Sequence, residues 1–147
     1  MTRFARFTAI VAMAALGAPY AAAEDRAAAA AAAKDDIAAT LGGVPTFVNA
    51  IADAALPGLW QQAKDLELSG DTALDRKTKA LISLAVAAQI PCTYCIWSDT
   101  QAARSAGATD QEIAEAVAMA GLTRNMSTIF NGMQVDFDTF RAEMAAN

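Results

Sequence analysis

The chain has 147 residues, a formal net charge of −5, two cysteines and no histidine. The absence of histidine excludes a Ser-His-Asp triad, an HExxH zinc site and a CxxCH haem attachment. An acidic chain without a basic cluster is not expected to bind nucleic acid. The length indicates one domain. Because alanine is the strongest helix former and accounts for 39 residues, we expect an all-α protein.

The N-terminal segment, 1–23, has the three-part plan of a secretory signal peptide. Arg3 and Arg6 stand near its start, an apolar run follows over 8–18, and small residues end it at Ala23. This order is that of a leader cleaved after an A-x-A site, and the run is short for a membrane span. We therefore expect a periplasmic or secreted protein with no membrane partner. An uncleaved amphipathic or buried helix is the alternative.

Residues 24–43 form an alanine-rich segment that ends at Gly42 and Gly43. The segment has the propensity to be helical, but it carries almost no large apolar side chain to bury. It is interpreted as a linker or a loosely held helix. Aromatic and branched residues begin at Val44, so we expect the folded domain to cover 44–147.

Apolar residues of this domain recur at the three- and four-residue spacing of helices. The expected helices cover about residues 47–55, 57–66, 75–90, 91–106, 109–119 and 123–144. No segment has a convincing strand pattern. The sequence therefore predicts an all-α domain of about six helices.

Several helix ends are marked by their residue types. Asp75 is a suitable N-cap, and 109–112 (Thr-Asp-Gln-Glu) has the spacing of a capping box. Pro91 interrupts one helix and can begin the next, and Gly107 is a natural C-terminal stop. A break or bend is expected at 131–132.

Cys92-Thr93-Tyr94-Cys95 is the one reactive constellation in the sequence. It follows Pro91, at the expected first turn of a helix, where free backbone N–H groups and the helix dipole favour a thiolate. Thiol–disulfide exchange needs that thiolate. A structural disulfide is an alternative, although so short a loop gains little from cross-linking. Metal binding is a second alternative, weakened because two cysteines supply only half of a zinc site.

The surrounding residues resemble the carboxymuconolactone decarboxylase superfamily, in its alkylhydroperoxidase AhpD-like branch. The likeness is carried by 74–88, the Cys92–Cys95 motif and 106–113. It implies an all-helical domain that assembles into trimers, dimers or hexamers. It also implies a redox-active cysteine pair that reduces peroxides and is recharged by a dithiol or protein electron donor. No cofactor and no metal are expected.

Two positions depart from that family's reductase motif. The motif has a Glu twelve residues before the first cysteine and a His four residues after the second, and here these positions hold Ala80 and Asp99. In the family scheme the second cysteine, Cys95, attacks peroxide and the first, Cys92, resolves it. A carboxylate one helical turn from Cys95 raises the pKa of its thiol. In the family, that Glu and His form the proton relay that activates the thiols. We therefore expect Asp99 to be a solvated acid that is only a remnant at the relay position. It can act as a base only if burial raises its own pKa.

The sequence thus predicts an exported thiol–disulfide oxidoreductase with antioxidant peroxidase (peroxiredoxin-type) activity, using Cys92 and Cys95 and lacking the family's Glu and His. The alternative is a non-catalytic oligomeric helical domain in which the same pair forms a structural disulfide. Lactone decarboxylation is disfavoured because the usual proton-transferring histidine is absent. A small helical domain with Phe130, Phe137 and Phe140 near its end is also expected to form a homo-oligomer.

Overall fold

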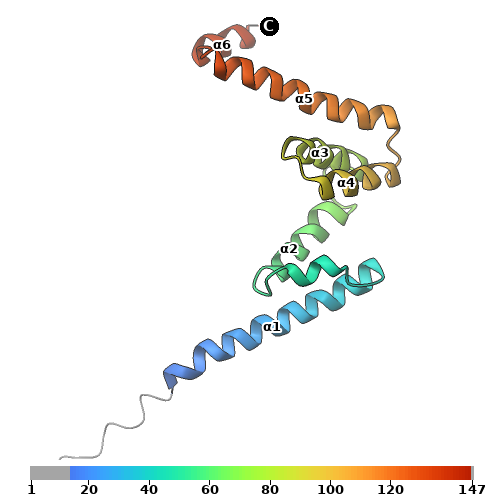
Figure 1. Cartoon of the computed structure of the whole chain (residues 1–147), viewed down its shortest axis with the longest axis vertical. Helices are drawn as coiled ribbons and strands as arrows, with labels where there is room; N and C mark the ends of the chain where they lie inside the picture. The colour runs from blue at the N-terminus through green and yellow to red at the C-terminus, as the bar shows by residue number, and fades with distance from the viewer. Residues whose placement is uncertain (1–13, 147) are drawn as a thin grey trace, which may run out of the picture. The chain divides into compact units, whose positions relative to one another are not determined.

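The computed structural model describes residues 14–146, and every regular element in that range is helical (Figure 1). The six α-helices are α1 (Ala14–Leu41), α2 (Leu56–Gln62), α3 (Arg76–Gln89), α4 (Thr93–Ser105), α5 (Asp110–Gly132) and α6 (Phe137–Ala145). A 3-10 helix, η1 (Thr46–Ala50), precedes α2, and a π-helical segment, η2 (Ala63–Leu68), follows it. The predicted all-α class is confirmed. Within the described range no helix is both long and apolar enough to cross a bilayer.

The start of the predicted signal peptide, with Arg3 and Arg6, lies outside the described residues. Helix α1 begins at Ala14 and continues past Ala23 without a break. Cleavage after Ala23 stays a prediction, as does export.

The described chain divides into two compact units, the first ending at Leu66 and the second beginning at Glu67. In the first unit α1 packs on α2, and small side chains on one face of α1 allow larger residues to approach it closely. The buried residues of this core are Ala30, Ala33, Ile37, Val48 and Leu56. The alanine-rich segment is therefore helical over 24–41, with one face buried.

A polar contact also joins α1 to the end of α2. The Trp60 indole N–H donates to an Asp36 carboxylate oxygen at 2.7 Å, and the Lys64 ammonium donates to the same oxygen at 2.5 Å. Lys64, and next Trp60, lower the pKa of Asp36. Because Asp36 and Lys64 remain partly exposed, the contact orients the two helices more than it stabilises them.

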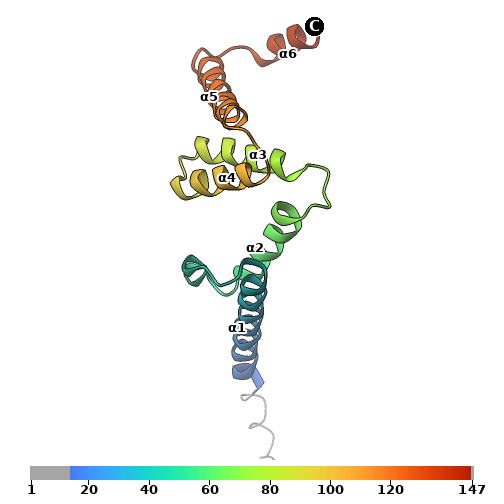
Figure 2. The ribbon, with the colours of Figure 1, turned by 90° about the vertical axis from the view of Figure 1, so that its right-hand side faces the viewer.

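In the second unit α3 and α4 lie side by side, and α5 also packs on α3 (Figures 1 and 2). The buried face of α3 includes Ala80, Leu84 and Ala87, and Ala103 is buried on α4. Figure 2 shows the α3–α4 pair edge-on, with α5 leading away from the end of α4. Helix α3 is thus the central helix of this unit, in contact with both α4 and α5.

The local signals for helix ends are confirmed. Asp75 caps α3 by accepting the Thr78 backbone N–H at 2.9 Å. Thr109 and Glu112 form the capping box of α5, with N–H to oxygen distances of 3.1 and 2.7 Å. Gly107 follows α4 with φ +85°, a left-handed conformation that glycine adopts without a Cβ penalty.

An ion pair connects this capping box to α3. The Lys77 ammonium donates to a Glu112 carboxylate oxygen at 2.7 Å. Lys77 and then the Thr109 backbone N–H lower the pKa of Glu112 to about 2.

Three predicted helix boundaries were wrong. The segment expected as a helix over 47–55 forms only the short η1, where the Val48 N–H bonds the Pro45 carbonyl three residues back. The helix expected from Pro91 begins at Thr93, with Cys92 as its N-cap. The stretches 109–119 and 123–144 share one helix, α5, up to Gly132, because Gly121 weakens a helix interior without ending it. The predicted break at 131–132 is where α5 ends.

Candidate redox site

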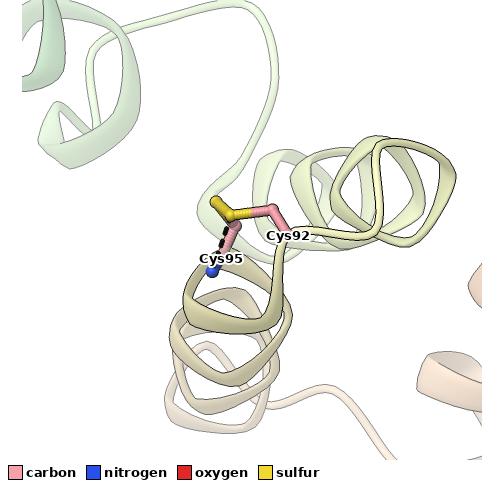
Figure 3. Close-up of a disulfide and its surroundings, with 2 residues drawn as sticks. All are labelled: Cys92 and Cys95. Atoms are coloured by element: carbon pink, nitrogen blue, oxygen red, sulfur yellow. Dashed lines mark hydrogen bonds between the residues drawn. A yellow bond between two sulfur atoms is a disulfide. The ribbon is translucent and has the colours of Figure 1, made fainter.

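Cys92 and Cys95 form a disulfide at the N-terminal end of α4 (Figure 3). Their Cα atoms lie 5.2 Å apart, within the usual range for a bonded pair. Cys92 is the N-cap of α4, and its sulfur accepts the Cys95 backbone N–H at 3.2 Å. Cys95 therefore stands in the first turn of the helix, where free N–H groups stabilise negative charge on sulfur after reduction.

The loop between α3 and α4 holds this pair firmly. The Cys92 N–H donates to the Ala87 carbonyl near the end of α3 at 3.1 Å, and the Ile96 N–H donates to the Cys92 carbonyl at 2.8 Å. Both cysteines are half-buried, while the neighbouring Tyr94 and Trp97 are 88% and 70% exposed. A small reagent or a partner thiol can therefore approach the disulfide from solvent.

The structure brings Ala80 of α3 and Asp99 of α4 to one small cavity of about 50 Å³. These are the two positions at which the chain departs from the reductase motif. The cavity is lined by Glu67, Leu68, Arg76, Lys79, Ala80, Ser83, Asp99, Ala102 and Ala106. The two positions that hold Glu and His in the family motif are thus adjacent in space, but here they carry a methyl group and a carboxyl group.

Asp99 is half-buried, unlike the fully solvated acid that the sequence suggested. Burial, and next the negative charge of Glu67, raise the pKa of Asp99 above its ordinary value of 3.8. Burial thus shifts the pKa of Asp99 upward, which is the shift that a base at this position needs. That Asp99 acts as a base stays a prediction.

Two residues of this cavity escaped the sequence analysis. Glu67 lies 32 positions before Asp99, and no local pattern brings them together. Lys79 is buried, and its ammonium donates to the Ser69 carbonyl at 2.9 Å, which ties the loop before α3 to that helix. Lys79 stands in the polar first turn of α3, so no pattern in the sequence indicated that it is buried.

A second, larger cavity of about 470 Å³ opens between α3 and α5. Its walls are mostly apolar, with Gln89 and Arg124 as polar members. The Arg124 guanidinium donates to the Gln89 carbonyl at 3.2 Å, and the Gln89 amide donates to the Ala120 carbonyl. These bonds join the two helices along the groove. Over residues 14–146 no group of three potential ligands is arranged to hold a metal ion.

Comparison with known proteins gives three similarities. The model of the carboxymuconolactone decarboxylase family matches residues 54–136. The crystal structure of the alkylhydroperoxidase AhpD core from Rhodospirillum rubrum is 33% identical and superposes with a TM-score of 0.65, covering 82% of this chain and 91% of that one. The uncharacterized protein 4 in the cox locus of Paracoccus denitrificans is 44% identical over 54 residues, 37% of this chain. That match spans 49%, about half, of the curated relative's length.

Proposed function

This chain belongs to the carboxymuconolactone decarboxylase family, in its AhpD-like branch, and from that premise we propose that it is an exported thiol–disulfide oxidoreductase that reduces peroxides. The observation that carries the proposal is the disulfide between Cys92 and Cys95, half-exposed at the start of α4. A redox pair needs an accessible sulfur and a group that stabilises the thiolate. The solved relative named above is an alkylhydroperoxidase core.

The proposed cycle consumes one peroxide and one dithiol. The Cys95 thiolate attacks a peroxide oxygen, the O–O bond breaks, and Cys95 becomes a sulfenic acid while the leaving oxygen takes a proton and departs as the alcohol. The Cys92 thiol then attacks the Cys95 sulfur, which releases water and forms the disulfide. A dithiol donor reduces that disulfide by exchange and is itself oxidised.

The resemblance to the family assigns the attack on peroxide to Cys95 and the resolving step to Cys92. Both residues stand at the N-terminal end of α4, where the Cys92 sulfur accepts the Cys95 backbone N–H at 3.2 Å. The free N–H groups of this helix end stabilise an anion there without a neighbouring cation. The protein therefore retains one activator of the thiolate even though Ala80 and Asp99 replace the family's Glu and His.

A peroxide-consumption assay tests this function. The mature protein is supplied with hydrogen peroxide or an organic hydroperoxide and with a series of small and protein dithiol donors. We expect turnover with at least one donor, and its loss in Cys92→Ser and in Cys95→Ser. Loss of the disulfide without any loss of peroxide consumption would exclude the cysteine pair as the catalyst.

The second candidate is a non-catalytic helical domain with a structural disulfide. It is favoured by the missing Glu and His. In that case the disulfide would resist reduction by glutathione-range reductants, and Cys→Ser variants would lower stability without affecting any peroxide chemistry.

Export is part of the proposal because of the leader predicted over 1–23. N-terminal sequencing of the protein isolated from a cell with a periplasm should begin at Glu24. A functional protein that retains Met1 would contradict both the leader and the predicted location.

Homo-oligomerisation is also proposed, and it is supported by an exposed apolar stripe on α5. Its members recur at alternating spacings of three and four residues, the pattern of a helix–helix seam. They are Met119, Leu122, Met126 and Ile129 on α5 and Met133, its C-cap, all of them exposed. An exposed apolar stripe of this length lowers the solubility of the protein unless a second copy of the chain covers it. Whether the assembly is a dimer, a trimer or a hexamer does not follow from the stripe.

A further inference from the structure

The groove between α3 and α5 has a mostly apolar lining and one charged end. Its volume is about 470 Å³, within the range of roughly 300–1,000 Å³ that small-molecule sites have. Helix α3 contributes Ile82, Ala85 and Val86 to the apolar lining, and α5 contributes Met119 and Ala120. Ile82, Val86 and Met119 are each about half exposed. A ligand with an apolar chain would remove this surface from water.

Arg124 supplies the charge at the polar end. Among the described residues that line the groove, it is the one ionisable side chain. Its guanidinium donates to the Gln89 carbonyl at 3.2 Å, which holds it at the C-terminal end of α3. In the described part of the chain, no carboxylate forms an ion pair with Arg124. Because a guanidinium has five N–H donors, most of them remain available to an anion.

The apolar and charged parts of the groove follow one another along α3. Ile82 lies seven positions before Gln89, a rise of about 10 Å at ~1.5 Å per residue. Val86 lies between them, one helical turn before Gln89. At the polar end, Gln89 bonds to Ala120 and to Arg124 of α5. The groove therefore offers a chain of medium length an apolar strip that ends at a cation.

The groove and the exposed apolar stripe use different faces of α5. At about 100° per residue, Thr123 and Arg124 lie roughly 100° and 160° around the helix from Leu122, which belongs to the stripe. Among the described residues, Met119 is the one that belongs to both the groove and the stripe. A second copy of the chain that covers the stripe can therefore leave the charged end of the groove open.

We propose that this groove binds a single-chain carboxylate of medium length, with its chain along Val86 and Met119 and its carboxylate on the Arg124 guanidinium. A guanidinium binds a carboxylate through two parallel N–H···O bonds. A neutral head group would leave that bidentate contact unmade, and a cationic head group would be repelled by Arg124. Binding of this ligand needs no peroxide chemistry, since among the described residues neither cysteine lines the groove.

Three probes test the site. Octanoate, octanol and octylammonium share one alkyl chain and differ in the charge of the head group. Each is titrated at neutral pH into the isotope-labelled full-length protein, and the shifts of backbone amide signals in NMR spectra give both the affinity and the location. The variants are Arg124→Gln, Arg124→Lys and Val86→Glu. The matched control is Arg141→Gln, which removes an exposed arginine of the same unit that does not line the groove.

We expect octanoate to bind about 5- to 10-fold more tightly than octanol, to shift the amides of Val86 and Thr123, and to bind more tightly than octylammonium. Arg124→Gln should weaken octanoate binding on the order of tenfold and leave octanol binding unchanged, because only the head-group contact is lost. Arg124→Lys should keep part of the preference, since the charge remains without the planar fork.

The two other variants test whether the groove itself is the site. Val86→Glu places a carboxylate on the apolar wall, so it should abolish octanoate binding by repulsion and by the lost apolar contact. Arg141→Gln should change the affinity of none of the three probes, because Arg141 lies on α6 and pairs with Asp138 there.

Three results would overturn the inference. One is an equal affinity of the wild type for octanoate and octanol. Another is a set of octanoate shifts confined to the apolar cavity of the first unit, which Leu41 and Trp60 line. The third is a wild type that binds no octanoate; if Val86→Glu then lowers the mass measured by light scattering, a second copy of the chain covers the groove instead.

The variants of Arg124 allow for damage to the groove. An octanoate affinity that Arg124→Gln leaves unchanged would also overturn the inference. If that variant loses octanol binding as well, Arg124→Lys decides, and equal binding of octanoate and octanol by the lysine variant would count against the site. Peroxide turnover enters none of these measurements, so a failure of the proposed function would leave this result standing.

Discussion

Replacing Asp99 by histidine, together with Ala80→Glu, should restore a fast peroxidatic cysteine. Side chains four residues apart on a helix have Cβ atoms about 5–6 Å apart. At that distance a unit charge is worth about 0.7 kcal/mol in water and about 3 kcal/mol at an effective dielectric constant of 20. One pKa unit corresponds to about 1.4 kcal/mol. Because Asp99 is only partly buried, the interaction energy between its charge and the Cys95 thiolate lies toward the lower end of this range.

Changing this neighbour from an anion to a neutral or cationic imidazole therefore lowers the pKa of Cys95 by about one unit. From a free value of about 8.5, that shift raises the thiolate fraction at pH 7 roughly from 3% to 25%. Ala80 is 8% exposed and borders the same cavity. A glutamate there can orient the new imidazole, which also titrates near neutral pH and so suits proton transfer.

The assay compares alkylation and peroxide turnover of the reduced variants at several pH values. We expect alkylation to rise about eightfold at pH 7, in proportion to the thiolate fraction, and peroxide turnover to rise at least as much. Ala80→Glu alone is the matched control, because it adds a carboxylate without an imidazole and should not accelerate either reaction. If the double variant keeps its helical circular dichroism and both rates stay at the wild-type value, the electrostatic reasoning about Asp99 is wrong.

Three further predictions concern stability and assembly. Leu84→Ala, which truncates a side chain that is 1% exposed in α3, should lower the free energy of unfolding by about 2–5 kcal/mol in urea titrations. The pKa of Glu112 is 4.5 in the unfolded chain and about 2 in the folded one. The stabilisation that the Glu112 carboxylate gives the fold is therefore present above pH 4.5 and lost as pH falls toward 2. The difference in free energy of unfolding between the wild type and Glu112→Gln should shrink from pH 5 to pH 2. Leu122→Glu should lower the mass measured by light scattering, whereas Thr128→Glu, about 120° around α5, should not; equal masses for the two variants would remove α5 as the interface.

The parts of this fold that the sequence predicted are those set by neighbours in the chain. Asp75 and the Thr109–Glu112 box bond backbone N–H groups within one turn, and Gly107 supplies a left-handed residue. Such signals need no tertiary partner, so residue type and spacing suffice to identify them. The position of Cys95 in the first turn of α4 belongs to the same class.

The failures have tertiary causes. Residues 47–55 carry a helical pattern, but Val48 instead packs against α1 from a short 3-10 turn. Glu67 and Asp99 line the same cavity because the loop before α3 folds against that helix. No spacing of residues in the sequence predicts this proximity. The burial of Asp99 follows from the same folding of the loop, so a residue that looked like a solvated acid lies in a cavity.

The reduction potential of the Cys92–Cys95 disulfide tests the central claim most directly. The full-length protein is equilibrated with dithiothreitol and glutathione buffers of known potential, and the fraction of free thiols is measured by alkylation. Redox-active pairs lie between about −120 and −270 mV, whereas structural disulfides lie below about −300 mV. The proposed function predicts a midpoint within the redox-active range. A midpoint below about −300 mV would contradict it and leave a helical domain with a structural disulfide.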